Sequence, residues 1–79
     1  MINKSLNNLE RVEMDFEGLF WTRQNEMIEE IEELDYIVTE VNWEYVSVTD
    51  MHDDEENCYI LYLGHANSTM WIESIRAMD

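Results

Sequence analysis

The residue types that most often carry chemistry are few in this chain. It has one cysteine, Cys58, and two histidines, His52 and His65. Structural zinc is usually held by four ligands in closely spaced pairs, and these three separated side chains do not form that pattern. Nucleophilic catalysis needs a base held beside the nucleophile, and the sequence has no nucleophile elbow and no glycine-rich phosphate loop. The sequence therefore predicts a protein that is not an enzyme, in which Cys58 is a small core residue at the start of a strand.

Carboxylates are the abundant functional group, and the densest run is Asp53, Asp54, Glu55 and Glu56. Oxygen-rich loops attract Ca²⁺ or Mg²⁺, but an EF-hand loop needs acidic residues at alternate positions and a glycine at the sixth. These acids are consecutive and the segment has no glycine. We therefore expect an acidic loop over residues 51–57, with no metal and no cofactor. A small metal-binding protein remains an alternative, which calorimetry with Ca²⁺ and Zn²⁺ would test.

The charge balance is the most informative property of the chain. It has 19 Asp and Glu against four Lys and Arg, a formal net charge of −15 on 79 residues. Solubility of a small domain is served by a net charge of about 2–8, and excess like charge opposes folding. The surplus therefore indicates a strongly basic partner. Direct binding to nucleic acid or to an anionic membrane is disfavoured, because both would repel the chain.

The first half of the chain predicts two helices. Apolar residues recur at spacings of three and four over residues 5–17, where Ser5 is the expected N-cap and Gly18 the stop. A second stripe predicts a helix over residues 23–34, capped by Thr22. The outer face of this second helix carries five glutamates, which are Glu26, Glu29, Glu30, Glu32 and Glu33.

The second half predicts strands. Residues 36–49 are rich in β-branched and aromatic side chains, and polar and apolar residues alternate over residues 40–45. A phase slip at Val46 indicates a bulge or tight turn within residues 42–46. Residues 58–63 are a short apolar run that we expect to be a central strand. Residues 69–75 fit either a strand or a helix, and the strand is favoured because Gly64 and Asn67 suggest a hairpin. The expected architecture is α+β, with residues 1–79 as one domain. Two N-terminal helices pack on an antiparallel β-meander of three to four strands.

A row of carboxylates with one apolar anchor is the expected binding surface. Carboxylates three or four residues apart on a helix lie ~5–6 Å apart, and duplex DNA carries one negative charge per ~1.7 Å of axis. Trp21, at a helix junction, is the best candidate for a partly exposed aromatic anchor, although the core is the favoured position for each of Trp21, Trp43 and Trp71. The candidate partner-binding residues are Glu26, Glu29, Glu30, Glu33, Glu40, Glu44, Asp53, Asp54, Glu55, Glu56 and Trp21.

In its small size, extreme acidity, single cysteine and richness in aromatics, the chain resembles the phage-encoded DNA-mimic inhibitors. That class includes anti-CRISPR proteins, anti-restriction proteins and inhibitors of uracil-DNA glycosylase. The resemblance implies an inhibitor in the cytoplasm of an infected or lysogenic bacterial host, with a CRISPR effector complex as the favoured target. It would block target DNA by occupying the nucleic-acid groove, as a monomer or a homodimer. The alternative is a regulatory adaptor or antitoxin-like protein that binds a basic partner without mimicking nucleic acid.

Overall fold

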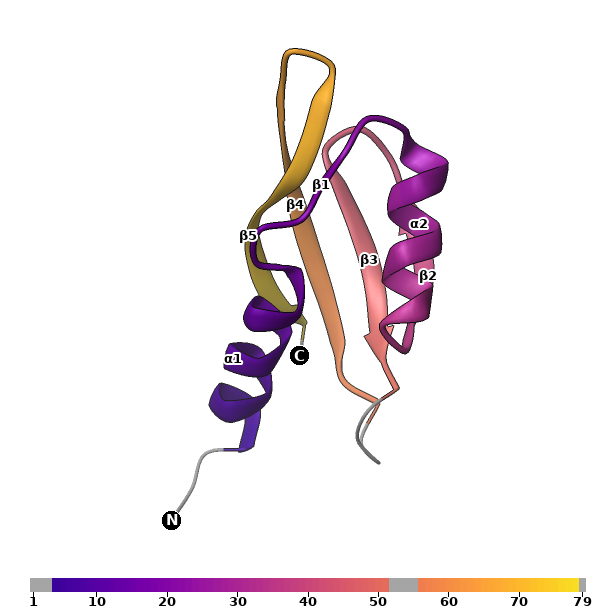
Figure 1. Cartoon of the computed structure of the whole chain (residues 1–79). Helices are drawn as coiled ribbons and strands as arrows, with labels where there is room; N and C mark the ends of the chain where they lie inside the picture. Colours follow the sequence, from indigo (N-terminus) through magenta and orange to yellow (C-terminus); the bar gives the residue numbers. More distant parts are fainter. Residues whose placement is uncertain (1–3, 52–55, 79) are drawn as a thin grey trace.

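Two helices and five strands make up the fold in a computed structural model that describes residues 4–51 and 56–78, with side chains from residue 9 onward. The elements in chain order are α1 (Lys4–Phe16), β1 (Phe20–Trp21), α2 (Gln24–Glu33), β2 (Tyr36–Val41), β3 (Tyr45–Asp50), β4 (Cys58–Ala66) and β5 (Thr69–Met78). The strands form one antiparallel sheet in the order β1-β5-β4-β3-β2, and both helices lie on the same side of it (Figure 1). The predicted α+β architecture is confirmed.

The ends of the helices follow local backbone chemistry. α1 ends at Phe16, and Gly18 then takes a positive φ of 77°, which glycine adopts without a steric penalty. The predicted stop at Gly18 is confirmed. The predicted cap at Thr22 is wrong, because α2 begins only at Gln24 and Arg23 occupies the N-cap position without a side-chain hydrogen bond. Thr22 is one residue too early to cap, and its hydroxyl lies 3.5 Å from a Glu26 carboxylate oxygen instead.

Two tight turns order the strands. The Asn42 side-chain oxygen accepts hydrogen bonds from the amides of Glu44 and Tyr45, at 2.8 and 3.0 Å, so the phase slip in the sequence marks the β2–β3 turn. The β4–β5 turn places Asn67 and Ser68 at φ values of 52° and 64°, as a two-residue hairpin requires. The last segment is therefore a strand, and β4 is central as predicted.

The two-residue strand β1 is an element that the sequence did not predict. Phe20 pairs with Trp71, and Trp21 pairs with Met70. Two residues are too few to show a period of two, and they follow directly on the apolar stripe of α1. Their pairing with β5 adds a fifth strand to the three or four that were expected.

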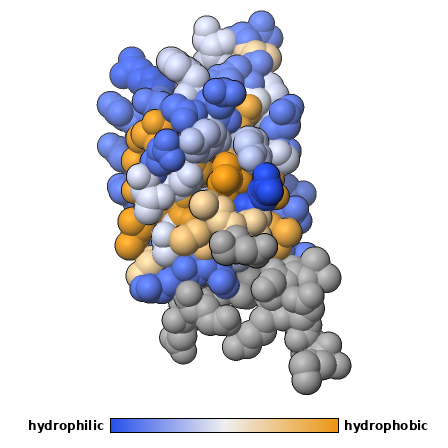
Figure 2. Space-filling view, turned by 180° about the vertical axis from the view of Figure 1, so that it is seen from behind, coloured by the Kyte–Doolittle hydropathy of each residue, from blue (hydrophilic) through white to orange (hydrophobic). Residues whose placement is uncertain are grey.

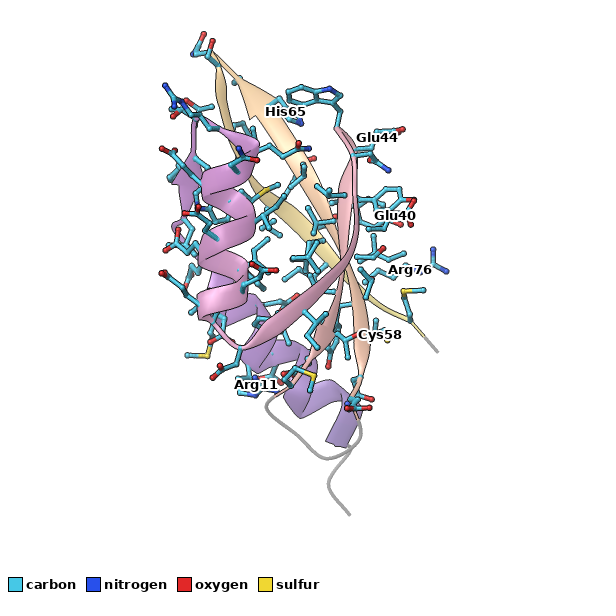
Figure 3. The ribbon with its side chains drawn as sticks, turned by 90° about the vertical axis from the view of Figure 1, so that its right-hand side faces the viewer. Arg11, Glu40, Glu44, Cys58, His65 and Arg76 are labelled. Carbon is cyan, nitrogen blue, oxygen red and sulfur yellow. The ribbon has the colours of Figure 1, made fainter. Side chains whose placement is uncertain are left out.

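The core lies between the helices and one face of the sheet. Val12 and Phe16 of α1 and Met27 and Ile31 of α2 pack there against strand residues such as Leu61. Side chains alternate along each strand, so every second strand residue lies on the opposite face, which neither of the two described helices covers (Figure 1). Figure 2 views the molecule from the side away from the helices, where hydrophobic residues are interleaved with polar ones. Figure 3 shows the labelled side chains of Glu40, Glu44, Cys58 and Arg76 on this open face.

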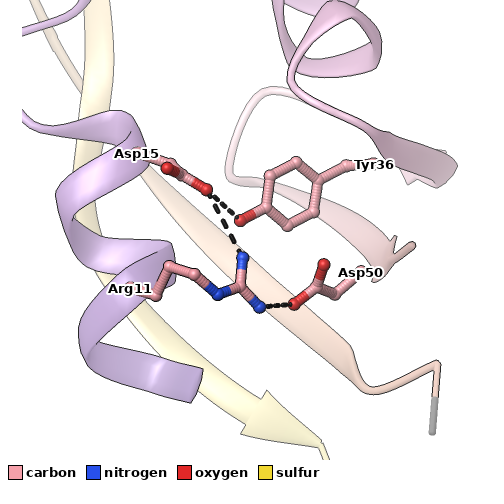
Figure 4. A network of polar contacts seen from close by, with 4 residues as sticks. All are labelled: Arg11, Asp15, Tyr36 and Asp50. Atoms are coloured by element: carbon pink, nitrogen blue, oxygen red, sulfur yellow. Dashed lines mark hydrogen bonds and ion pairs between the residues drawn. The ribbon is translucent and has the colours of Figure 1, made fainter. Parts of the chain in front are cut away.

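A polar network fixes α1 to the sheet (Figure 4). Arg11 donates a hydrogen bond to Asp50, which ends β3 and is fully buried. A second Arg11 nitrogen lies 3.7 Å from Asp15, and the Tyr36 hydroxyl donates to Asp15 at 2.7 Å. The network thereby joins one face of α1 to the start of β2 and the end of β3.

This network makes the fold sensitive to alkaline pH. Burial and the hydrogen bond to Asp15 raise the pKa of Tyr36, whereas tyrosine in the unfolded chain titrates near pH ~10. Above pH ~10 the unfolded chain therefore binds fewer protons than the folded one, and stability falls as the pH rises. One such group lowers the free energy of unfolding by up to ~1.4 kcal/mol per pH unit. We expect the free energy of unfolding to fall less steeply with pH in Tyr36→Phe than in the unchanged protein. Chemical denaturation of both proteins between pH 8 and 11 measures it, and parallel curves would contradict it.

Candidate protein-binding surfaces

The outer face of α2 is a row of exposed carboxylates. Met27 and Ile31 hold the helix on the core, so Glu26, Glu29 and Glu33 lie on the solvent side together with Glu32. None of them forms an ion pair among the side chains described, where the ion pairs join Arg11 to Asp15 and to Asp50, and Arg23 at the N-cap is the only Lys or Arg within the segment from Thr22 to Leu34. The structure therefore brings together three of the four glutamates that the sequence proposed on this helix.

Glu30 and Trp21 contact each other within the fold and are not part of the exposed row. Glu30 is half-buried and its Oε1 accepts a hydrogen bond from Trp21 Nε1 at 2.6 Å. Trp21 is 5% exposed, so the expectation of a partly exposed anchor is wrong. The reason is β1: successive strand residues point to opposite faces, and the pairing with β5 turns Trp21 toward the core and leaves Phe20 64% exposed.

Glu40 and Glu44 lie on the open face, on the other side of the sheet from α2 (Figure 3). A bulge between Val38 and Glu40 sets this direction, and Glu40 accepts a hydrogen bond from the Tyr45 hydroxyl at 3.1 Å. The single row that was expected to run from α2 onto β2 is therefore split between two surfaces. Glu56 is exposed just before β4, whereas Asp53, Asp54 and Glu55 lie outside the described residues.

A groove of about 530 Å³ runs between α1 and β5. Its walls carry exposed apolar side chains, of which Met14 is 72% exposed, and the carboxylates Glu10, Glu13 and Glu17. The sequence prediction missed it, because its walls come from opposite ends of the chain. The sequence feature that could have indicated the groove is Met14, an apolar residue that lies among acidic residues of α1 and off its apolar stripe.

Trp43 was expected to be a core residue and is 68% exposed instead. It lies in the β2–β3 turn rather than in a strand, and its carbonyl oxygen is 2.7 Å from His65 Nε2. Cys58 starts β4 as predicted, but it is half-buried on the open face beside Thr49. His52 lies outside the described residues, and within the described ranges no three His, Cys, Asp or Glu side chains are grouped to hold a metal.

The unpaired acidic surface predicts a salt response of the free protein. Like charges on a small surface repel one another, and salt screens this repulsion. We expect the melting temperature to rise by several degrees between about 10 mM and 0.5 M NaCl. A stabilisation of 1 kcal/mol corresponds to about 4–8 °C for a domain of this size. Scanning calorimetry measures it, and a melting temperature that falls with NaCl would contradict an unneutralised surface.

Neither helix in the described part of the chain is long and apolar enough to cross a membrane. Comparisons of the chain with protein-family models, with curated proteins and with solved structures give no match, so function is argued from the surfaces described above.

Proposed function

We propose that this protein is an acidic inhibitor that binds the nucleic-acid groove of a bacterial defence or DNA-processing protein as a DNA mimic. Anti-CRISPR activity, in which it blocks target DNA from a CRISPR effector complex, is the favoured case. The observation that supports the proposal is the exposed, unpaired row Glu26, Glu29 and Glu33 on a helix that the core holds in place. Such a row is complementary to the Lys and Arg that hold phosphates in nucleic-acid grooves.

The structure changes which residues would form the interface. The mimic surface is proposed for the helix side of the molecule, where Glu32 joins the row. Glu30 and Trp21 support that surface from below through their hydrogen bond. Glu40 and Glu44, on the open face, are left out of it. Carboxylates held by a packed helix need little ordering on binding, which favours affinity.

Affinity capture with competition tests this function. The immobilised protein would be exposed to a bacterial lysate at low salt and eluted with a salt gradient, and each captured protein would be retested with duplex DNA and with guide RNA. A nucleic-acid-binding protein that elutes early in the gradient and is displaced by DNA is the expected result. Binding that is insensitive to salt and to both competitors would contradict mimicry.

A second candidate is the adaptor or antitoxin-like protein that binds a basic partner without mimicking nucleic acid. The exposed apolar side chains Trp43, Phe20 and Met14 favour it, because a purely electrostatic mimic does not need them. The two functions differ in one observable. A mimic and DNA exclude each other from the target, whereas an adaptor allows a ternary complex that size-exclusion chromatography detects.

A further inference from the structure

We propose that the groove between α1 and β5 docks an extended segment of the partner protein, which adds a strand to β5 and alternates Lys or Arg with apolar residues. This deepens the proposed function, on which it rests for the choice of a basic protein as partner. Three independent features of the groove carry it: its apolar wall, its charge and the free edge of β5.

The apolar wall lies where β1 meets β5. The rings of Phe20 and Trp71 are 6.0 Å apart, and Phe20 is 64% exposed. Because their neighbours Trp21 and Met70 are buried on the helix side, Phe20 and Trp71 face the other side of the sheet. A large aromatic side chain as exposed as Phe20, beside a groove, is typical of a protein-binding site.

The charge of the groove is of one sign. Glu10 and Glu13 of α1 and Glu17, the residue after its end, follow one another at spacings of three and four and line the groove on the α1 side, and Glu73 lines it from β5. No Lys or Arg is among the residues that line the groove. A segment that binds in the groove is therefore expected to carry Lys or Arg on the side that faces α1.

The edge of β5 supplies the backbone groups for pairing. β1 pairs with Met70 and Trp71 only, so in the described part of the chain β5 has no strand partner from Ile72 onward on the side opposite β4. An unpaired edge offers N–H and C=O groups to an extended peptide, a recurrent mode of peptide recognition.

These features together fix the pattern of the segment. A strand added in line with β1 sends alternate side chains to the two faces of the sheet. One set reaches the glutamates of α1, with aliphatic stems over Met14, and therefore suits Lys or Arg. The other set lies beside Phe20 and Trp71 and suits apolar residues.

A synthetic peptide tests the inference without any nucleic-acid-binding target. The probe is a fluorescein-labelled eight-residue peptide that alternates Lys and Val, with binding measured by fluorescence anisotropy. We expect binding to be at least about tenfold weaker when Val is replaced by Ser, and to be lost when Lys is replaced by Glu. A version N-methylated at the amides of one edge should also fail, because it cannot pair with β5. Equal binding of the N-methylated peptide would overturn strand addition.

Two charge-matched variants locate the binding. E13K/E17K changes the charge of the groove, and E29K/E33K makes the same change of net charge on α2. The side chains of all four of these glutamates are exposed. We expect a loss of about tenfold or more in peptide affinity for the first and less than about threefold for the second. Equal losses would overturn the groove as the site.

The same pair separates this inference from the proposed function. If E29K/E33K abolishes capture of a DNA-displaceable target while E13K/E17K changes neither capture nor peptide binding, the groove inference fails and the proposed function stands. If the peptide binds in the groove and no captured protein is displaced by DNA, the proposed function fails and the groove stands.

Discussion

Replacing Glu26, Glu29 and Glu33 with lysine is expected to weaken binding to the nucleic-acid-binding target by at least about a hundredfold, or ~2.8 kcal/mol. Close charge pairs across an interface have coupling energies of about 1.5–7 kcal/mol, and reversal turns each attraction into repulsion. All three side chains are exposed, so the fold should persist. Surface plasmon resonance at about 0.1 M NaCl measures the change, because at this ionic strength the Debye length is still ~10 Å.

A matched variant separates a specific surface from overall charge. E40K/E44K/E56K makes the same change of net charge away from α2. All three glutamates are exposed, and Glu40 and Glu44 lie on the open face. We expect it to lose less than about fivefold in affinity. Glu30 is omitted from the test set because its reversal would remove the hydrogen-bond acceptor of Trp21. Similar losses in both triple variants would contradict a binding surface on α2.

Arg11→Ala is expected to destabilise the fold by about 3–5 kcal/mol, because it removes a cation from a fully buried carboxylate, that of Asp50. A protein of this length has a total stability of about 4–12 kcal/mol, so the expected loss is a substantial part of it. Urea unfolding followed by circular dichroism measures the difference. A change below about 1 kcal/mol would show that the pair contributes like an exposed one.

The double variant R11M/D50L tests whether the loss comes from burying the Asp50 carboxylate without the Arg11 cation. Replacing both partners of a buried ion pair with apolar residues is often neutral or stabilising. We therefore expect the double variant to be more stable than Arg11→Ala by about 2 kcal/mol or more. An additive loss in the double variant would instead assign the effect to packing of the Arg11 stem.

Periodicity in the sequence was sufficient to predict the main helices and strands. The stripe that includes Met27 and Ile31 predicted α2, and the turn residue Gly18 predicted the end of α1. β1 could not be predicted, because two residues show no period and their pairing with β5 depends on the tertiary fold. The burial of Trp21 follows from that pairing.

The candidate binding surfaces were less predictable than the fold for a related reason. Which face a strand residue occupies depends on register, and the bulge after Val38 decides it for Glu40. The groove depends on two elements far apart in the chain, α1 and β5. The sequence predicted which side chains carry charge, whereas their grouping into surfaces follows from packing.

The one-sided sheet has a consequence for how the molecule meets a partner. Its helix side carries the carboxylates of α2 and α1, whereas the described charges on the open face include the cation Arg76 as well as Glu40 and Glu44. Charge divided in this way gives the molecule an electric dipole moment across its thickness. In the field of a positive groove this dipole exerts a torque, so the molecule rotates helix side first before contact. More encounters then begin in a productive orientation, and the association rate rises while the dissociation rate is unchanged.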